Sequence, residues 1–312
     1  MDFLLNHCTD AHWNMAHDEF LLEQVPGMVF CLWQNAPAVI VGQNQSVYAE
    51  VNLPYLKEHG IALARRVTGG GAVYHDLGNL NYSIAGPMDL MENALDLVPE
   101  ALRQLGAPVQ RSGRNDLLVD GRKCSGYAKR LSKSRMMIHG TLMWDVELEN
   151  LTQALATPGS KLEAAGIASV RSRVANLRTY LPQFPTLEAF RDALQEALAQ
   201  GGKAITLTPG QLAAIDRLAD EKFRTWEWIY GHSPESAHQK SMKFPCGTVT
   251  VHYTLKHGVL DSLSFSGDFL GNRPAEQLAQ QLIGQPLSAV ASVAPGDYFD
   301  GMSPEDFLSL FS

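Results

Sequence analysis

The 312-residue sequence has only four cysteines, and they lie far apart, at positions 8, 31, 124 and 246. None belongs to a Cys-x-x-Cys pair, so the sequence indicates neither a zinc ribbon nor a thioredoxin-like redox site. No apolar run approaches the roughly 18 residues of a transmembrane helix, and residues 1–7 lack the basic and apolar regions of a secretion signal. Few, scattered cysteines without such a signal favour the reducing cytoplasm, and we expect no membrane association.

Two common nucleotide-binding motifs are also missing. The sequence contains no G-x-x-x-x-G-K-[ST] P-loop, and its glycines do not follow the G-x-G-x-x-G spacing of dinucleotide-binding folds. Positive charge is in deficit, with 25 Lys and Arg against 33 Asp and Glu, which argues against a general nucleic-acid-binding protein. The composition is that of a globular protein, and the length suits two domains or one large and one small.

The most informative stretch is a run of three glycines at positions 69–71, between two short apolar segments. Such a run lets the backbone take positive φ angles and leaves no Cβ to obstruct a ligand, so exposed N–H groups can bind an anion. Arg65 and Arg66 precede the glycines, and His75 and Asp76 follow them. Cations and titratable groups therefore flank a candidate ligand-binding turn, although a glycine run is also typical of a turn that is merely mobile.

A β-hairpin is predicted at residues 115–124, because Asp120-Gly121 is a pair that favours a two-residue type I′ turn. The hairpin places Asp116 and Lys123 on adjacent antiparallel strands. We expect Ser125-Gly126 to break the second of these strands, since glycine weakens a strand interior.

The hairpin lies in a basic part of an acidic protein. Residues 111–135 hold eight Lys and Arg against two Asp, a local balance of 8 − 2 = +6, which leaves −14 for the rest of a chain of net charge −8. Such an island suggests an anionic ligand or an acidic partner, and the alternative is an ordinary solvated surface.

The remaining pattern mixes short strands and amphipathic helices, which predicts an α+β protein. Helices are predicted over residues 11–25, 54–59, 92–106, 161–166, 186–200, 209–223 and 274–283 and from 303, and strands over 28–34, 39–41, 61–64, 72–74, 81–84, 136–144, 247–255 and 259–265. The aromatic residues of 226–231 are expected in the core. The polar residues 231–240 predict a boundary between a large domain, residues 1–235, and a small C-terminal α+β domain, residues 241–312.

Three separate pieces suggest one site: the glycine turn with Arg66, the hairpin with Asp116 and Lys123, and the strand with His139. Cations beside a glycine-rich turn suit a small acid bound next to a nucleotide, as in acyl-adenylate formation, where positive charge must bring two anions together. Mg²⁺ on Asp116 would help to hold the phosphates. Plainer explanations exist for each residue. Lys123 could be a solvated side chain, Asp116 a turn cap and His139 a core residue, and His75-Asp76 could be a local hydrogen-bonded pair.

Taken together, these motifs resemble the lipoate–protein ligase A family. The similarity rests on residues 65–76 (RRVTGGGAVYHD), 112–117 (SGRNDL), 123–126 (KCSG), 139–142 (HGTL), 161–174 (KLEAAGIASVRSRV) and 226–228 (WEW). These motifs occur in order along nearly the whole chain. The C-terminal unit resembles the accessory domain of the bacterial ligases.

The resemblance implies a catalytic domain of the biotin/lipoate ligase type, related to class II synthetase cores. It also implies that lipoate, or octanoate, reacts with ATP to give an acyl-adenylate and pyrophosphate. The acyl group would then pass to a specific lysine on lipoyl carrier domains, those of 2-oxoacid dehydrogenase E2 subunits and of the glycine cleavage H protein. In this family the carriers are typically acidic, so the basic island would meet them.

Site residues follow from the resemblance position by position. ATP would contact Arg66, Gly71, Ala72, Val73, Tyr74 and Lys123; lipoate would contact Gly70, His75, Lys123 and His139; and Asp116 would bind Mg²⁺. Lys123 would be the catalytic residue that holds the reacting carbonyl, and Arg130 is a further candidate near the site. The acyl chain needs an apolar tunnel, which the sequence does not locate.

Three positions depart from the family pattern: Gln43, where a basic residue is common; Cys124, where Val or Ile is expected; and Tyr127, where a small residue is common and whose ring would narrow the acyl pocket. Cys124 keeps a rival open, an octanoyltransferase of the same fold that works through a cysteine thioester without ATP. A non-catalytic lipoate-binding protein is another alternative. Biotin ligase is disfavoured because no G-R-G-R-x-G-R run occurs.

Overall fold

The structure is a computed structural model that describes residues 1–155, 172–230, 238–256 and 259–311. The predicted helix at 161–166 lies outside these residues, as do most of the 161–174 motif and most of the predicted boundary segment. Among the described residues, no helix is both long and apolar enough to cross a membrane.

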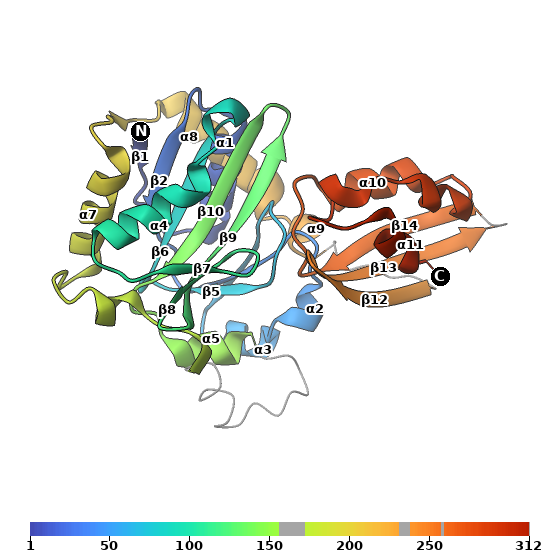
Figure 1. Cartoon of the computed structure of the whole chain (residues 1–312), viewed down its shortest axis with the longest axis horizontal. Coiled ribbons are helices and arrows are strands. Elements are labelled where there is room, and N and C mark those ends of the chain that lie inside the picture. Colours follow the sequence, from blue (N-terminus) through green and yellow to red (C-terminus); the bar gives the residue numbers. More distant parts are fainter. Residues whose placement is uncertain (156–171, 231–237, 257–258, 312) are drawn as a thin grey trace.

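The larger part of the molecule is built on one mixed sheet of eight strands (Figure 1). Its spatial order is β11 (Ala204–Ile205), β1 (Asp2–Leu5), β2 (Val29–Trp33), β6 (Asn79–Pro87), β10 (Arg135–Met143), β9 (Arg122–Ser132), β8 (Asp116–Val119) and β7 (Gln110–Ser112). β1 pairs in parallel with both β11 and β2, and the other neighbours are antiparallel. With the helices described below, this confirms the α+β class expected from the sequence.

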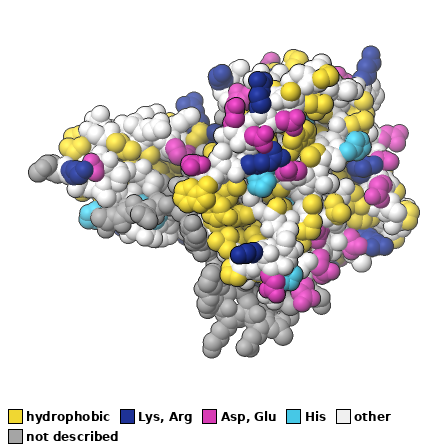
Figure 2. All heavy atoms as spheres, turned by 180° about the vertical axis from the view of Figure 1, so that it is seen from behind, with side chains coloured by type: hydrophobic (Ala, Val, Ile, Leu, Met, Phe, Trp, Pro, Cys, Tyr) yellow, Lys and Arg dark blue, Asp and Glu magenta, His cyan; other side chains and the backbone are white. Residues whose placement is uncertain are grey.

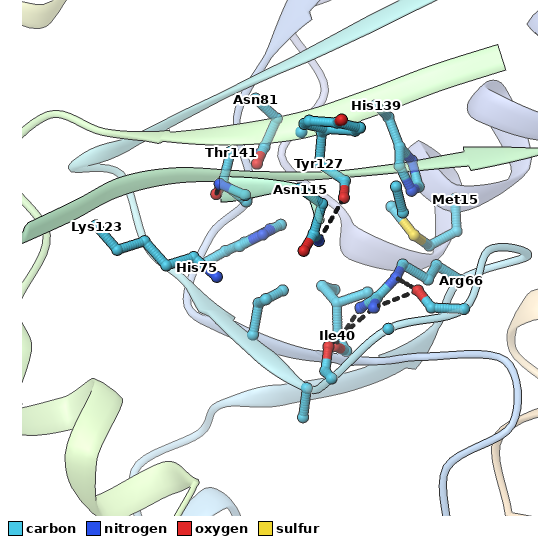
Figure 3. A pocket seen from close by; sticks show the side chains of 18 of the residues that line it. Met15, Ile40, Arg66, His75, Asn81, Asn115, Lys123, Tyr127, His139 and Thr141 are labelled. Carbon is cyan, nitrogen blue, oxygen red and sulfur yellow. Dashed lines mark hydrogen bonds between the residues drawn. The ribbon is translucent and has the colours of Figure 1, made fainter. Parts of the chain in front are cut away.

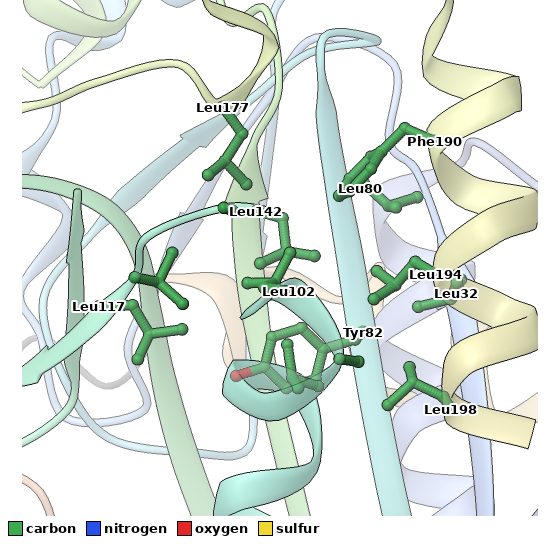
Figure 4. Close-up of a cluster of buried hydrophobic side chains, with 14 of the residues drawn as sticks. Leu32, Leu80, Tyr82, Leu102, Leu117, Leu142, Leu177, Phe190, Leu194 and Leu198 are labelled. Atoms are coloured by element: carbon green, nitrogen blue, oxygen red, sulfur yellow. The ribbon is translucent and has the colours of Figure 1, made fainter. Parts of the chain in front are cut away.

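Helices cover both faces of this sheet, and each face has its own apolar core. α4 (Ala94–Gln104) and α7 (Leu187–Ala199) pack on one face, where Leu80, Tyr82 and Leu142 meet them (Figure 4). α1 (Ala11–Gln24) and α8 (Pro209–Leu218), which continues as a π-helical turn at Ala219–Phe223, pack on the other. Since side chains alternate along a strand, β6 directs Leu80, Tyr82 and Ile84 to the first face and Asn81 and Ser83 to the second.

A second, three-stranded sheet carries the glycine turn. Its order is β4 (Ala62–Arg65), β3 (Ala38–Val41) and β5 (Val73–His75), so the three glycines connect its two edge strands. α2 (Val47–Glu50), α3 (Leu53–Glu58) and α5 (Leu148–Ala154) surround an apolar cluster on one side of this sheet.

The C-terminal unit has a core of its own, whose members all lie between residues 242 and 311. It consists of an antiparallel sheet, β12 (His238–Phe244), β13 (Gly247–Lys256) and β14 (Val259–Gly267), with α10 (Ala275–Leu282) and α11 (Pro304–Ser309). Figure 1 shows it beside the larger part of the molecule. β12 was not predicted, because its polar sequence, HQKSMKF, pairs on one side only and leaves alternate side chains exposed.

Most predicted elements are confirmed, one expectation is wrong and another holds only in part. The hairpin turn has the two positive φ angles of a type I′ turn, 49° at Asp120 and 71° at Gly121. Ser125-Gly126 does not break the second strand, since β9 continues to Ser132 and pairs with both neighbours. The aromatic segment at α9 (Trp226–Ile229) is only partly core: Ile229 is buried, but Trp226 is 60% exposed.

Candidate functional site

A cavity of about 150 Å³ lies where the glycine turn, β9, β10 and α1 meet (Figure 3). Its wall includes nearly all the residues that the sequence proposed. Those residues are Arg66, Gly70, Gly71, Ala72, Val73, His75, Lys123 and His139. The structure thus brings together segments separated by more than 70 positions in the chain.

Lys123 reaches the cavity because of a β-bulge. Leu117 pairs with Ser125 and Leu118 pairs with Lys123, so Cys124 is an extra residue without an opposite partner. In a regular strand, Cys124 and not Lys123 would share a face with Gly126, which lines the cavity. The bulge reverses this order and directs Cys124 into the core.

Two neighbours fix the Lys123 ammonium. Its Nζ lies 2.7 Å from Oδ1 of Asp116 on β8. A Cβ on Gly126 would lie 3.1 Å from both Cε and Nζ of Lys123, closer than ordinary contact, so glycine at this position leaves room for the ammonium. The residue expected to break the strand is therefore the one that accommodates the lysine.

His75 is neutral, and its hydrogen bonds define its tautomer. Asn14 Nδ2 donates to Asn35 Oδ1 at 2.7 Å, so the Asn35 amide presents its own Nδ2 to His75 Nδ1 at 3.1 Å. The His75 proton is then on Nε2, which has no partner among the described residues. Burial, with Arg66 and His139 nearby, lowers the His75 pKa to about 3. The imidazole therefore offers one neutral N–H donor at the cavity.

A second free donor is Asn81, which is 1% exposed. Asn79 Nδ2 donates to Asn81 Oδ1 at 2.7 Å, and Asn81 Nδ2 has no partner among the described residues. In the view of Figure 3, Asn81, His75 and Lys123 lie toward the same end of the cavity. Buried donors without partners are costly, so this end of the cavity is built to meet an acceptor-rich group such as a carboxylate.

Other parts of the wall are apolar. Met15, Trp33, Ile40, Val73 and Ala128 contribute side chains from four strands and one helix. Their presence beside the donors gives the cavity the character of a site for an aliphatic acid. This is the apolar region that the sequence did not locate, and Tyr127 lines the same cavity, as its position suggested.

Arg66 holds the glycine turn together. Its guanidinium donates to the carbonyl oxygens of Gly69 at 2.7 Å, Gly71 at 2.8 Å and Ile40 at 3.1 Å, and to Thr68 Oγ1 at 3.1 Å. Burial, and the neighbouring Arg65, lower its pKa to about 10. The charge that the sequence assigned to ATP thus also stabilises the conformation of the loop.

His139 is buried between two polar side chains and still lines the cavity. Its Nδ1 lies 2.6 Å from Asp18 Oδ2, and its Nε2 lies 2.7 Å from Thr68 Oγ1. Both ring nitrogens are thereby engaged, in contrast to those of His75.

The C-terminal unit covers the glycine turn. Gly70 N–H donates to the carbonyl oxygen of Phe269 at 3.0 Å, and Gly267 N–H donates to that of Asn44 at 2.8 Å. A Cβ at Gly69 would lie 2.3 Å from the Phe269 oxygen, which explains why glycine is needed there. The Gly70 N–H, proposed to face a ligand, is thus bound to the C-terminal unit in this structure.

Four candidate residues lie outside the cavity wall. Tyr74 points the other way from Val73 and His75, as alternation along β5 requires, and packs in the cluster against α3 and α5. Asp116 lies behind Lys123, and Arg130 binds Gln43 Oε1 and the Val67 carbonyl. Cys124 is fully buried, and burial raises the pKa of its thiol to about 12.

Some members of the basic island have partners within the chain. Arg111 pairs with Asp96 and Lys123 with Asp116, and Arg135 binds backbone carbonyls at the end of α1. Figure 2 shows the opposite side of the molecule from Figure 1, where Lys and Arg are scattered among Asp and Glu. Part of the island's charge is thus paired within the chain, and its contact with an acidic carrier stays a prediction.

Several other wall residues were not predicted from the sequence: Met15, Trp33, Ile40, Asn81, Asn115 and Thr141. One signal was available for Asn81. Polar residues at 79, 81 and 83 alternate with apolar ones at 80, 82 and 84, so three successive positions on one strand face are polar yet buried. Such a face inside a protein indicates a polar site.

Comparison with known proteins adds to this geometry. The lipoyl protein ligase A/B catalytic domain model matches residues 10–199, and that of the bacterial lipoate protein ligase C-terminus matches 233–311. Lipoate-protein ligase LplJ of Bacillus subtilis (strain 168) is 36% identical, with 96% of each chain covered.

Two solved structures are similar in fold. A bi-partite lipoate protein ligase with its E2 lipoyl domain from Thermoplasma acidophilum has a TM-score of 0.68 and 27% identity, over 76% of this chain and 98% of that one. A lipoate-protein ligase A bound with ATP has a TM-score of 0.65 and 27% identity, over 74% and 98%. The mixed sheet with its C-terminal unit is the lipoate ligase fold, and the chain belongs to the lipoyl protein ligase A/B family.

Proposed function

We propose that this chain is an ATP-dependent lipoate–protein ligase. It activates lipoate, or octanoate, to the acyl-adenylate and transfers the acyl group to a specific lysine of a lipoyl carrier domain. Carrier domains of 2-oxoacid dehydrogenase E2 subunits and the glycine cleavage H protein are the proposed acceptors. The name of the Bacillus subtilis relative and the ATP-bound structure of a similar ligase support the reaction. The Thermoplasma structure with an E2 lipoyl domain supports the class of acceptor.

One observation carries the proposal: the ammonium of Lys123 and two unpartnered donors, His75 Nε2–H and Asn81 Nδ2, face one cavity whose remaining wall is largely apolar. A carboxylate satisfies all three donors, and an aliphatic chain satisfies the apolar wall. A site built only for a nucleotide would not need Met15, Trp33 and Ile40 in its wall.

The residues suggest how the two steps proceed. In the first, a carboxylate oxygen attacks the α-phosphorus of ATP, an oxygen–phosphorus bond forms, and pyrophosphate leaves. Lys123 would reduce the repulsion between the two anions, because it brings a positive charge to the cavity wall. In the second, the carrier amine attacks the acyl carbon, AMP leaves with the bonding electrons, and the amine gives up a proton. His75 and Asn81 can donate to the carbonyl oxygen as its charge increases.

The nucleotide side of the proposal rests on the glycine turn. Gly71 and Ala72 line both the cavity and a neighbouring hollow of about 630 Å³, whose wall is rich in serine and threonine. A ligand with an acyl part and a nucleotide part could therefore lie across these two residues. Arg66, Val73 and the backbone of Tyr74 complete the proposed ATP contacts.

Mg²⁺ is proposed at Asp116. The carboxylate is partly exposed, next to Lys123 and one residue from Asn115 in the cavity wall. Mg²⁺ is usually held in proteins by one or two carboxylates, with phosphate and water oxygens as the other ligands, so a single Asp fits. Bound there, the ion would neutralise phosphate charge.

We further propose that residues 1–235 form the catalytic domain and residues 241–312 an accessory domain. The separate C-terminal core supports this division, and β12 extends the accessory unit to His238. A cytoplasmic location is consistent with four free cysteines.

The deciding experiment is pyrophosphate release from ATP with and without lipoate, followed by mass analysis of an apo carrier domain. We expect release that requires lipoate and Mg²⁺, and an added lipoyl group on one lysine. A parallel series with octanoate measures the chain preference. Acyl transfer between carriers without ATP would contradict the proposal and favour the octanoyltransferase. Lipoate binding with neither release nor transfer would favour a binding protein.

A further inference from the structure

Behind the cavity lies Asp18, a residue of α1 that is 1% exposed and does not line the cavity itself. Its two carboxylate oxygens accept hydrogen bonds from two different residues. Ser83 Oγ donates to Oδ1 at 2.5 Å, and His139 Nδ1 lies 2.6 Å from Oδ2. Each of these residues continues into a chain of hydrogen bonds that ends at the cavity wall.

The first chain leads to the apolar wall. Trp33 Nε1–H donates a hydrogen bond to Ser83 Oγ at 2.9 Å, and the Ser83 hydroxyl in turn donates one to Asp18. The indole of Trp33 lines the cavity. Its orientation is therefore fixed by a serine that is itself fixed by the buried carboxylate.

The second chain leads to the glycine turn. Arg66 Nε–H donates to Thr68 Oγ1 at 3.1 Å, and Thr68 Oγ1 lies 2.7 Å from His139 Nε2. Among the described residues, the hydrogen-bond acceptor within reach of the Thr68 hydroxyl is His139 Nε2. This direction requires a bare Nε2 and hence a proton on Nδ1, where Asp18 accepts it. Every donor in the chain then has an acceptor, and Arg66 Nε–H also reaches the Gly69 carbonyl oxygen at 3.2 Å.

We propose that Asp18 is a positioning residue of the acyl-binding cavity. It sets the tautomer of His139 and, through Thr68 and Arg66, holds the glycine turn. Through Ser83 it also holds Trp33. One buried carboxylate thus orients two walls of the cavity that come from different sheets. The inference rests on the proposed function only for its kinetic part, because the tautomer of His139 is a property of the free protein.

The direct test is nitrogen-15 NMR of the full-length protein labelled at histidine, with the His139 signal identified from a His139→Gln variant. We expect a protonated Nδ1 and a bare Nε2 in the unliganded protein. Asp18→Asn should remove that preference. A proton on Nε2 in the wild-type protein, alone or together with one on Nδ1, would overturn the proposal.

Kinetics separate the two chains. Thr68→Val removes the hydroxyl at nearly constant volume and should lower the kcat of lipoate-dependent pyrophosphate release by about 10- to 100-fold, since small misplacements of a reacting group have effects of this size. Thr68→Ser restores the hydroxyl and should recover most of that loss. Ser83→Ala releases Trp33 and removes one donor from Asp18 Oδ1, but leaves the hydrogen bonds from His139 to Thr68 and Arg66 in place. It should raise the KM for lipoate more than it changes kcat.

The matched control is Thr152→Val. Thr152 is also buried and its hydroxyl donates to the Leu148 carbonyl at 2.7 Å within α5, outside both chains. If Thr68→Val behaves like Thr152→Val, or if Thr68→Ser gives no recovery, the proposal is wrong although the ligase function stands. If the wild-type protein releases no pyrophosphate with lipoate, the proposed function fails, and the NMR experiment still decides the role of Asp18.

Discussion

Gly69 lies against the carbonyl oxygen of Phe269 so closely that a methyl group on its Cα would be 2.3 Å from that oxygen. The same oxygen accepts the Gly70 N–H at 3.0 Å. The glycine turn and the C-terminal unit are therefore joined backbone to backbone. Gly69→Ala should force them apart, because neither partner is the end of a flexible side chain. We expect faster amide hydrogen exchange at Gly70 and in residues 267–270, and faster proteolysis.

Gly71→Ala is the matched control. The nearest atom to a Cβ at Gly71 is Asp268 Cβ, at 4.0 Å, and its backbone does not require positive φ. Its exchange rates should stay close to those of the wild-type protein. Equal rates in the two alanine variants would show that the Phe269 contact does not hold the C-terminal unit in solution.

Cys124 should be dispensable for activity. Its thiol lies in the core, donates to the Leu117 carbonyl at 3.4 Å, and has a pKa raised to about 12 by burial. A nucleophilic thiol needs the opposite, an accessible position and a lowered pKa. We expect Cys124→Ala to keep acyl transfer within about twofold and to lose about 1 kcal/mol of stability, as buried truncations commonly do.

The comparison variant is Cys246→Ala, which removes another fully buried thiol from the C-terminal core. Both variants should be compared in transfer assays and in urea unfolding. Loss of transfer in Cys124→Ala alone, with lipoate binding retained, would revive the thioester mechanism.

Lys123→Ala should abolish adenylate formation. Removing a preorganised charge-stabilising group typically lowers kcat by about 100- to 1000-fold, and no other ammonium lines the cavity among the described residues. The assay is lipoate-dependent pyrophosphate release. Lys57→Ala, at an exposed position of α3, supplies the control and should behave as wild type. A Lys123→Ala enzyme with undiminished kcat would remove the central residue from the mechanism.

Buried histidines should make the fold sensitive to acid. Burial lowers the pKa of His17 to about 4 and that of His75 to about 3, whereas an unfolded imidazole titrates near 6.5. Between these values the unfolded chain binds more protons, so stability is complete above about pH 6.5 and falls as the pH is lowered. Each imidazole contributes a slope of up to about 1.4 kcal/mol per pH unit.

The variant that checks this is His17→Leu, because His17 is 1% exposed and its Nδ1 has no partner among the described residues. The free energy of unfolding in urea, measured from pH 7.5 to pH 4.5, should fall less steeply than in the wild-type protein. His7→Ala, at an exposed position, should leave the slope unchanged. Parallel curves for wild type and His17→Leu would contradict the expectation.

Local chemistry made much of the fold predictable. Asp120-Gly121 defined its turn, and Thr208 and Gln211 form the capping box that their spacing indicated. The glycine run, Lys123 and His139 were assigned to one site, and they share one cavity. These features depend on residues close in sequence or on motifs with a known mechanism.

What could not be predicted depends on tertiary contacts. Gly126 looked like a strand breaker, and its lack of a side chain instead accommodates Lys123. Asp18 is a charged residue of α1, yet in the folded protein it is buried and accepts hydrogen bonds from Ser83 of β6 and His139 of β10. No local pattern shows that a polar residue will find buried partners from strands more than 60 positions away.

The bulge at Cys124 has a further consequence. One unpaired residue decides whether an amine or a sulfur atom faces the cavity from the same strand. A regular strand without the bulge would turn the Cys124 side chain toward the cavity and the Lys123 side chain away from it, with the same sequence. The functional group that this strand offers to the cavity is thus set by backbone register as well as by residue type.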